Sequence, residues 1–337
     1  MKLFESYKIK NIELSNRLVM PPMCTYQCFK KDGKAYDFHY GHYISKGIGN
    51  VGLIIVEATG VMENGRISDY DLGLYEDSQI EGLSKIVKGI HNQGSKVAIQ
   101  LNHAGRKSET TNLKHIGPSA IKYNDLPIDY ESCTKEDIED VIKAFKESAI
   151  RADKSGFDGL EIHAAHGYLI HQFISPLSNK REDEYGKDRF LLLKNILKEV
   201  KSVWPNKKPL WIRISASDYH KDGLKVEDWI EFLNDNPDIV DLVHVSAGGV
   251  VNVPINVYPG YMLDFSKKIK EETNYKTIGV GLLNNIDIIN YALESQKSDL
   301  IATGRALLRN PNFFLGLAYE SKKIDSLPEV YKRAYRI

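Results

Sequence analysis

The sequence predicts a closed (β/α)8 TIM barrel that occupies residues 1–337 as a single domain. Short β-branched runs alternate with longer amphipathic segments along the whole chain, which is the pattern of a parallel sheet with crossover helices. Eight strand-helix pairs fit into the 337 residues, and this favours a closed barrel over an open sheet. An open doubly wound sheet would also carry a G-x-G-x-x-G turn after its first strand, and here that strand ends PPMCTY.

The expected barrel strands are short and rich in β-branched residues. Several, such as VGLIIVE, are continuously apolar rather than alternating. This is expected where helices cover one face of a strand and the barrel interior fills the other. The eight strands are expected at 18–23, 51–57, 96–101, 158–162, 210–215, 240–245, 277–280 and 299–303.

The segments between the strands carry helix start and stop signals. After Thr134, apolar residues from Ile138 to Ala152 share one helical face. Thr134 and Asp137 have the spacing of a capping box, and Gly156 is placed to end the helix in a left-handed turn. Further helices are expected near 77–92, 189–203, 225–234, 262–272, 285–296 and 310–320.

Two segments are expected to lie outside the barrel repeat. An amino-terminal hairpin precedes the first barrel strand and is expected to cap the barrel. Residues 102–133, which include Pro118 and Pro127, form a long excursion after the third strand. Long loops in barrels usually serve as lids or subunit contacts.

Composition excludes several classes of partner. Lys plus Arg equals Asp plus Glu at 45 each, so no net field attracts nucleic acid or an anionic membrane. The first residues lack the apolar core of a signal peptide, and no window approaches a membrane span. Three sparse cysteines suggest reduced thiols rather than disulfides. We therefore expect a cytoplasmic protein.

Reactive side chains follow several of the expected strands at their carboxyl ends, where catalytic groups gather in this fold. Strand one is followed by Cys24 and Tyr26, strand two ends at Glu57 and Ala58, strand three carries Gln100, strand four runs into His163, His166 and Tyr168, and strand five carries Arg213.

Glycines follow the last three strands and leave backbone N–H groups exposed. They are Gly248 with Gly249, Gly281, and Gly304, which precedes Arg305. Such glycines are the usual phosphate cradle of barrels, because small residues let backbone donors approach an anion. Arg305 would add a charge-assisted contact. The alternative is that these glycines are simple turns.

Five segments form a recognisable set: PPMCTYQ, HYISKGIGNVGLIIVEATGV, GSKVAIQLNHAGRK, GFDGLEIHAAHGYLIHQFISPLSNKREDEYG and DLIATGRALLRNP. Together they resemble the old yellow enzyme family, and within it the bacterial single-domain NADPH dehydrogenases that carry a cysteine after the first strand. H-A-A-H-G-Y-L with its following S-P-L-S-N is the most specific signature. The resemblance extends from the amino-terminal hairpin to the last residues.

The resemblance implies an oxidoreductase with FMN across the barrel mouth and NADPH as reductant. It places Pro21, Pro22, Met23, Cys24 and Ala58 behind the isoalloxazine, Gln100 and Arg213 at its pyrimidine edge, and Gly248, Gly281, Gly304 and Arg305 around the phosphate. Arg213 would stabilise the negative charge that develops on reduced flavin. Lys107 is carried over as a neighbour of flavin and substrate, and Tyr26 as a substrate contact.

The implied reaction is reduction of activated C=C bonds in α,β-unsaturated carbonyl compounds, with nitro compounds and quinones as further substrates, in a detoxifying role. His163 and His166 can converge as two donors on one carbonyl oxygen, so that flavin N5 delivers hydride to the β-carbon. Tyr168 would then protonate the α-carbon as general acid. Cys24 would contact flavin or substrate and tune the reduction potential; the alternative is a small core residue.

The carboxyl-terminal residues, about 322–337, resemble a tail with which this subgroup inserts an arginine into a neighbouring subunit's site. Arg333 is the match in YKRAYRI, with Arg336 as the alternative. A homodimer or homotetramer is therefore expected. The chain departs from the family at DEYGKDRF, which is several residues shorter than usual and affects a turn rather than the flavin site.

Other functions stay open from the residues alone. H-x-x-H at His163 and His166 could ligate a metal in a TIM-barrel hydrolase, although Gln100 and Arg213 would be poor further ligands and no metal is expected. A non-catalytic flavin-binding protein would need the cofactor but not the acid. The larger dienoyl-CoA reductase type would add an iron–sulfur motif and a second nucleotide-binding domain, and neither is expected here.

Overall fold

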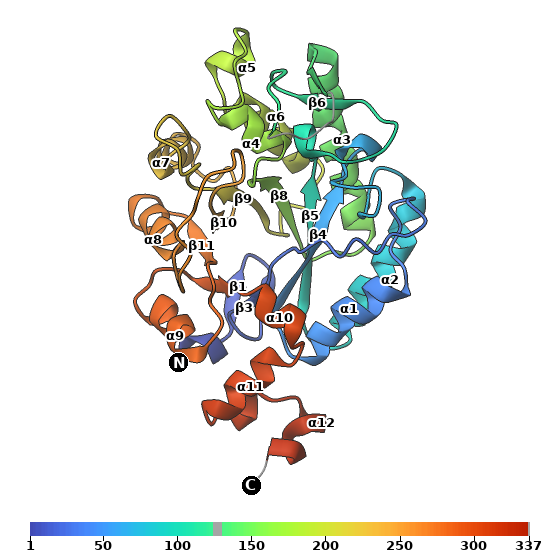
Figure 1. Cartoon of the computed structure of the whole chain (residues 1–337). Coiled ribbons are helices and arrows are strands. Elements are labelled where there is room, and N and C mark those ends of the chain that lie inside the picture. Colours follow the sequence, from blue (N-terminus) through green and yellow to red (C-terminus); the bar gives the residue numbers. More distant parts are fainter. Residues whose placement is uncertain (124–129, 336–337) are drawn as a thin grey trace.

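Eight parallel strands close into a barrel in the computed structural model, which describes residues 1–123 and 130–335 (Figure 1). The predicted TIM barrel is thus confirmed, and each predicted strand overlaps one barrel strand. In the order in which they pair around the barrel, the strands are β3 (Leu18–Met20), β4 (Leu53–Gly60), β5 (Lys96–Asn102), β8 (Gly159–Ala164), β9 (Leu210–Ser215), β10 (Leu242–Ser246), β11 (Lys276–Gly279) and β12 (Leu300–Ala302).

Helices surround the barrel, and every predicted helix is among them. The α-helices of the described residues are α1 (Asp37–Ile48), α2 (Ile80–His91), α3 (Lys135–Lys154), α4 (Leu169–Ile174), α5 (Glu184–Lys187), α6 (Leu191–Lys201), α7 (Val226–Asp235), α8 (Leu263–Glu272), α9 (Ile286–Glu294), α10 (Arg305–Arg309), α11 (Phe313–Glu320) and α12 (Glu329–Lys332). None of the described helices combines the length and the apolar run that crossing a bilayer requires.

Helix α1 lies between the first two barrel strands, where no helix was predicted. Its sequence DFHYGHYISKGI contains two glycines and several aromatic or β-branched residues, all weak helix formers. Packing compensates, because Tyr43 and Gly47 are buried between this helix and its neighbours. Tertiary contacts therefore stabilise a helix that local helix propensity does not predict.

Helix α3 begins and ends as its sequence predicts. Thr134 Oγ1 accepts a hydrogen bond from the Asp137 N–H at 3.0 Å, and the Asp137 carboxylate accepts one from the Thr134 N–H at 2.8 Å. These reciprocal bonds satisfy two free donors of the first turn. Gly156, just beyond the helix, has φ +91° and so takes the left-handed conformation that stops it.

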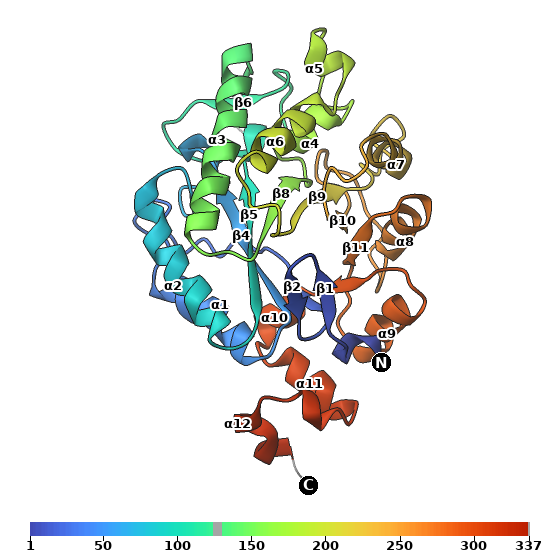
Figure 2. The ribbon, with the colours of Figure 1, turned by 180° about the vertical axis from the view of Figure 1, so that it is seen from behind.

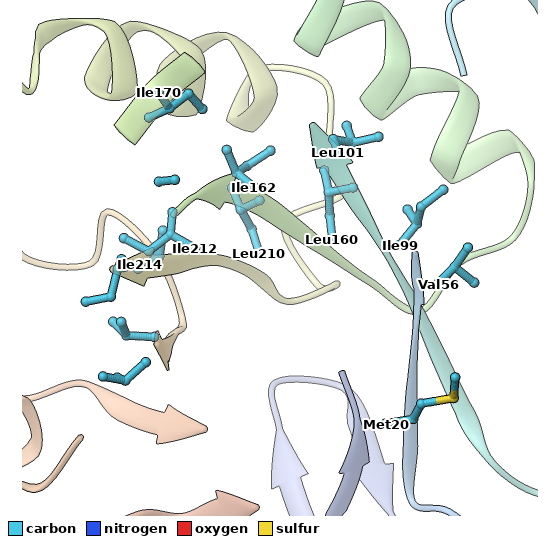
Figure 3. Close-up of a cluster of buried hydrophobic side chains, with 14 of the residues drawn as sticks. Met20, Val56, Ile99, Leu101, Leu160, Ile162, Ile170, Leu210, Ile212 and Ile214 are labelled. Atoms are coloured by element: carbon cyan, nitrogen blue, oxygen red, sulfur yellow. The ribbon is translucent and has the colours of Figure 1, made fainter. Parts of the chain in front are cut away.

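Alternate side chains of each barrel strand point outward, where the helices bury them (Figure 3). They form a continuous apolar layer between sheet and helices, and all are at most 2% exposed. Its members in Figure 3 include Met20, Val56, Ile99, Leu101, Leu160, Ile162, Leu210, Ile212 and Ile214.

The inward side chains change character along the strands. Near the amino ends they are apolar and form a second core that includes Val19, Leu53, Ala98, Trp211, Leu242, Ile278 and Leu300. The hairpin of β1 (Tyr7–Ile9) and β2 (Ile12–Leu14) closes this end, because Ile9, Ile12 and Leu14 join the same core. Figure 2 shows this hairpin in front of the barrel. The predicted cap is thus confirmed.

Nearer the carboxyl ends the inward residues become polar. Parallel register sets Gln100, Glu161 and Trp211 side by side on β5, β8 and β9. Two residues further along the strands, the register pairs His163 with Arg213 and Arg213 with His244. A polar layer therefore lies above the apolar core of the barrel.

The predicted excursion after the third barrel strand is also present. It contains β6 (His115–Gly117) and β7 (Tyr130–Ser132), which pair in parallel with each other rather than with the barrel. Pro118 directly follows β6. Pro127, the second proline of this expected loop, lies outside the described residues.

Replacing Phe145 by alanine tests the outer core. This α3 side chain is 0% exposed in the layer between sheet and helices. The change should lower the free energy of unfolding by about 3–5 kcal/mol, because the transfer and cavity costs add. Urea denaturation measures this. Lys143→Ala on the exposed face of α3 is the control, and a loss equal to that of Phe145→Ala would contradict the assigned packing.

Candidate active site

The end of β8 and the strained turn after it carry three of the predicted site residues. His163 lies in β8, and His166 follows with φ +57°, a left-handed conformation that is uncommon outside glycine. The Ser215 hydroxyl accepts a hydrogen bond from the His166 N–H at 2.9 Å, and Lys107 Nζ donates to the His166 carbonyl oxygen at 2.9 Å. These contacts from β9 and from the loop after β5 hold the strained residue in place.

Glycine at two positions lets this turn pack against the loop after β10. A Cβ atom on Gly167 would lie 2.1 Å from the Gly249 carbonyl oxygen. A Cβ atom on Gly249 would lie 2.6 Å from the His166 Cα. Both glycines also have positive φ, +73° and +101°. The two loops therefore touch backbone to backbone, which fixes the position of His166 relative to β10.

The two histidine side chains converge as predicted, but they hydrogen-bond each other. Nε2 of His163 and Nδ1 of His166 lie 2.9 Å apart, so one nitrogen donates and the other accepts. Nε2 of His166 lies 2.8 Å from Ser246 Oγ. Nδ1 of His163 is buried without a hydrogen-bond partner in the part of the chain that the structure describes. Both rings thus meet at the predicted place, with one nitrogen of His163 still unpaired.

Both imidazoles are neutral. Burial lowers the pKa of His163 and His166 well below the ordinary value of 6.5, and the positive charge of Arg213 lowers it further. A neutral imidazole carries one N–H and one acceptor nitrogen. The pair can therefore bind an oxygen atom by hydrogen bonding, and it does not carry a full charge.

Tyr168 and Lys107 lie against the histidine pair. The Tyr168 ring centroid is 4.8 Å from that of His163, and Lys107 Nζ is 5.0 Å from the centre of the Tyr168 ring. Burial raises the pKa of the Tyr168 phenol well above its ordinary value of 10.0. Burial, and then the positive charge of Arg106, lowers the pKa of Lys107 to about 8. Tyr168 is therefore a protonated phenol. It lies beside Lys107, whose ammonium group loses its proton more readily than that of an ordinary lysine.

Cys24 lies after β3, beside two buried carboxylates. Its Sγ and one oxygen each of Glu57 and Asp71 lie within 4.8 Å of one another. Burial raises the pKa of the Cys24 thiol well above 9.0, and the negative charges of Asp71 and Glu57 raise it further. Cys24 is therefore a thiol rather than a thiolate. Ala58, next to Glu57 in β4, is also buried.

A cavity of about 320 Å³ lies among the ends of β3, β9, β10, β11 and β12 and collects many of the predicted cofactor residues. The predicted cofactor residues that line this cavity are Pro21, Pro22, Met23, Arg213, Gly281, Gly304 and Arg305. A Cβ atom on Gly304 would lie 2.9 Å from Met23 Sδ, so a side chain there would crowd this cavity. Ser246, Asn284 and Arg309 also line the cavity, and they were not predicted from the sequence.

One predicted donor differs from expectation. The N–H of Gly248 donates to the Ser217 carbonyl oxygen at 2.7 Å, because the chain turns sharply there with φ +77°. Its backbone donor is therefore not exposed for a phosphate, in contrast to the prediction. Gly248 instead shapes the loop that packs on the histidine turn.

The remaining predicted site residues lie away from the cavity and the histidine pair. Tyr26 is 50% exposed and has φ +56°, and it follows Cys24 at the mouth of the barrel. Arg333 is exposed in the carboxyl-terminal segment, which both views place beyond the ring of helices rather than over the strands (Figures 1 and 2). The alternative, Arg336, lies outside the described residues. Arg333 therefore does not reach the mouth of its own barrel.

The residues present fit FMN. A cofactor site needs a concave pocket of a few hundred Å³ with convergent polar groups. Arg305 and Arg309 supply positive charge for a phosphate, and Arg213 lines the same cavity from β9. Arg213 Nε is buried and has no hydrogen-bond partner among the described residues, which leaves a donor for a ligand. Fold and site together define a flavin-binding TIM-barrel oxidoreductase.

The chain belongs to the NADH:flavin oxidoreductase / NADH oxidase family, which matches residues 2–323. It is therefore an FMN-dependent oxidoreductase. An NADPH dehydrogenase of Clostridium acetobutylicum is 48% identical over 99% of this chain and 100% of that protein. An NADPH dehydrogenase of Listeria welshimeri is 45% identical over 99% of both chains.

Solved structures share the fold at lower identity. Morphinone reductase in complex with tetrahydroNAD has a TM-score of 0.79 at 23% identity, covering 94% of this chain and 92% of its own. A 2-naphthoyl-CoA reductase has a TM-score of 0.89 at 22% identity, covering 97% of this chain. This chain spans about half, 53%, of that second protein.

Acidification should destabilise the protein through its buried histidines. Burial lowers the pKa of His39, His42 and His103 to about 4, 4 and 3, and that of His163 and His166 well below 6.5. Below pH 6.5 the unfolded chain binds protons that the folded chain does not, so stability falls as pH falls. Each histidine should cost roughly 1 kcal/mol between pH 7 and 5.5.

Urea denaturation of wild type and of a His163→Asn, His166→Asn variant at both pH values measures the contribution of the pair. The variant should lose about 2 kcal/mol less than wild type on acidification, although it is less stable at each pH. An equal loss in both proteins would contradict the assignment of neutral, buried imidazoles.

Proposed function

We propose that this protein is an NADPH-dependent ene-reductase that reduces activated C=C bonds of α,β-unsaturated carbonyl compounds, and also takes nitro compounds and quinones. The observation that carries the proposal is the convergence of a neutral histidine pair with a protonated phenol beside the Arg213 cavity. The near-full-length similarity to NADPH dehydrogenases supports the choice of NADPH. A cytoplasmic location and a role in removing reactive electrophiles belong to the same proposal.

The histidine pair binds the substrate oxygen. The facing nitrogens of His163 and His166 are 2.9 Å apart, so an oxygen atom can lie within hydrogen-bond distance of both once their mutual bond breaks. When the ring that now accepts carries its single proton on the facing nitrogen instead, each neutral ring donates an N–H to that oxygen. Two donors on a carbonyl oxygen stabilise the negative charge that develops there, and the β-carbon becomes electrophilic.

FMN, when bound, supplies the hydride that reaches the β-carbon. Pro21, Pro22 and Met23 would support its ring system, Arg213 its pyrimidine edge, and Gly281, Gly304, Arg305 and Arg309 its phosphate. Gln100 does not line this cavity; it is buried beside Glu161 and would reach the same edge from β5. The Arg213 charge favours the anionic form of a reduced ring. The Cys24 thiol, held protonated between two carboxylates, is a neutral neighbour that can influence reduction without adding charge.

Tyr168 delivers the proton. Its phenol stays protonated in the folded protein and is therefore a donor, and the enolate that it would protonate is a strong base. Lys107 Nζ holds the His166 and Gly249 carbonyl oxygens at 2.9 and 3.3 Å and lies over the Tyr168 ring. Lys107 thus positions the turn that carries both the acid and one histidine.

The metal-hydrolase alternative has less support. Across residues 1–123 and 130–335, one group of three His, Cys, Asp or Glu side chains has ligand atoms within 4.8 Å of one another. It consists of Cys24, Glu57 and Asp71 and contains neither histidine of the pair. His163 and His166 therefore lack the third ligand that a catalytic zinc site requires.

Tyr168→Phe tests the reductase against a non-catalytic flavin protein. The variant should bind FMN and be reduced by NADPH at the wild-type rate, because the phenol does not take part in that step. Reoxidation of the reduced protein by cyclohexenone should slow by about 10²–10⁴-fold, the usual contribution of a general acid. Anaerobic stopped-flow absorbance separates the two half-reactions.

Tyr70→Phe is the matched control, because Tyr70 lies at the surface, 40% exposed, and Lys31 Nζ lies over its ring. It should leave both half-reactions unchanged. If Tyr168→Phe reoxidised as fast as wild type with cyclohexenone, the assignment of Tyr168 as acid would be wrong.

A neighbouring subunit should complete the substrate site. Arg333 is exposed and far from its own barrel mouth, and the same segment exposes Val330 at 71%. Light scattering should show a dimer or tetramer, and a chain ending at Glu329 should lose substrate affinity. Arg333→Ala should raise the KM for the enone with little effect on FMN binding. A monomer that keeps full activity when it ends at Glu329 would contradict this arrangement.

A further inference from the structure

Glu161 is a buried carboxylate inside the barrel that the proposed reaction does not use. It lies on β8, two residues before His163, and is 0% exposed. An isolated charge at such a position would be very costly, so its partners decide whether it can exist. The barrel supplies them from three other strands.

Three hydrogen bonds reach the Glu161 carboxylate. Gln100 Nε2 on β5 donates to Oε1 at 2.7 Å. Trp211 Nε1 on β9 donates to Oε2 at 2.6 Å, and His244 Nδ1 on β10 lies 2.6 Å from the same oxygen. A carboxylate only accepts, so His244 carries its proton on Nδ1. These three groups tie Glu161 to neighbouring strands on both sides.

Glu161 is ionised despite its burial. Burial alone would raise the pKa of this carboxyl, but the hydrogen bonds from His244 and Trp211 and the positive charge of Arg213 outweigh it and hold the pKa below its ordinary value. Burial lowers the pKa of His244, so that ring is neutral and donates as an ordinary N–H. Glu161 therefore places one full negative charge near Arg213.

The carboxylate determines which way round the Gln100 amide sits. Oε1 of Glu161 can only accept, so Gln100 must present its NH₂ group to it. The carbonyl oxygen of Gln100 is then the amide atom left to accept from a ligand. Glu161 thus determines that Gln100 accepts rather than donates a hydrogen bond on its ligand side, although Glu161 itself contacts no ligand.

We propose that Glu161 is a positioning residue for the flavin: it fixes Gln100 as an acceptor toward a ring N–H of FMN, and it offsets part of the Arg213 charge at the pyrimidine edge. The proposal rests on the proposed function, because that function places Gln100 and Arg213 at FMN. It concerns how tightly FMN binds and at what potential it is reduced. It does not make Glu161 a catalytic residue.

Glu161→Gln is the informative change because the barrel can accommodate it. A glutamine that keeps its oxygen toward Trp211 and His244 satisfies both of those donors. Its NH₂ group then faces Gln100, which must turn its own carbonyl oxygen inward and its NH₂ group toward the ligand. The variant therefore changes Gln100 from a hydrogen-bond acceptor to a donor toward the ligand. It also removes one negative charge, and the side-chain volume stays the same.

Two measurements on Glu161→Gln follow. The Kd for FMN, from fluorescence titration of the apoprotein, should rise about tenfold, because one hydrogen bond to the ring is replaced by two facing donors. The midpoint potential of bound FMN, from spectroelectrochemistry, should become more positive, because the lost negative charge no longer opposes an anionic reduced ring. Neither measurement depends on turnover.

Trp211→Phe is the matched control in the same cluster. It removes one donor to Glu161 but keeps the carboxylate charge and the Gln100 contact, so the Kd should stay within about twofold and the potential should not move. Equal changes in Glu161→Gln and Trp211→Phe would mean general disruption and would overturn the inference. So would an unchanged Kd and potential in Glu161→Gln. Wild-type protein that bound no FMN would instead overturn the proposed function itself.

Discussion

Closure of the eight parallel strands is the constraint on which the rest of the structure depends. A closed barrel has one interior, so every second side chain of every strand points into the same space. The depth of a residue along its strand then decides its surroundings. Val19 and Leu53 near the amino ends meet the hairpin cap, whereas Glu161 and Arg213 further along meet the mouth. Apolar core and polar site are thus successive layers of one interior.

Water exclusion at the mouth sets the ionisation states on which the chemistry rests. Burial keeps the two histidines neutral, Tyr168 protonated and Cys24 a thiol. The Glu161 carboxylate is buried and charged, and it lies near the positive charge of Arg213. A buried charge needs such a partner, because the unpaired charge would be more costly than the pair. The site therefore has hydrogen-bond donors at defined positions, and its buried carboxylate lies near a cation.

The sequence predicted the parts of this arrangement that local pattern encodes. Eight strands, the capping box at Thr134 and the left-handed stop at Gly156 all follow from residue type and spacing, and the structure confirms them. Helix α1 was missed because its glycines and aromatic residues form a helix only when packed. The pairing of His163 with His166 was expected, yet their mutual hydrogen bond depends on a strained turn that spacing alone does not reveal.

Contacts between strands were harder to predict. Glu161, Trp211 and His244 sit in three separate segments, and only the barrel register brings them together. The sequence does contain an indication of this cluster, because each of the three is a polar or bulky residue at an inward position of a largely apolar strand. The Gly248 N–H was assigned to phosphate because glycine was read as an open turn, whereas the folded loop satisfies it internally.

The central claim is that the barrel mouth joins a flavin site to an oxygen-binding histidine pair and a proton donor. An anaerobic absorbance titration tests it most directly. The purified protein should be yellow with FMN, lose its colour when NADPH is added, and regain it when cyclohexenone follows. A colourless protein that cannot take up FMN, or a reduced form that cyclohexenone leaves bleached, would contradict the account.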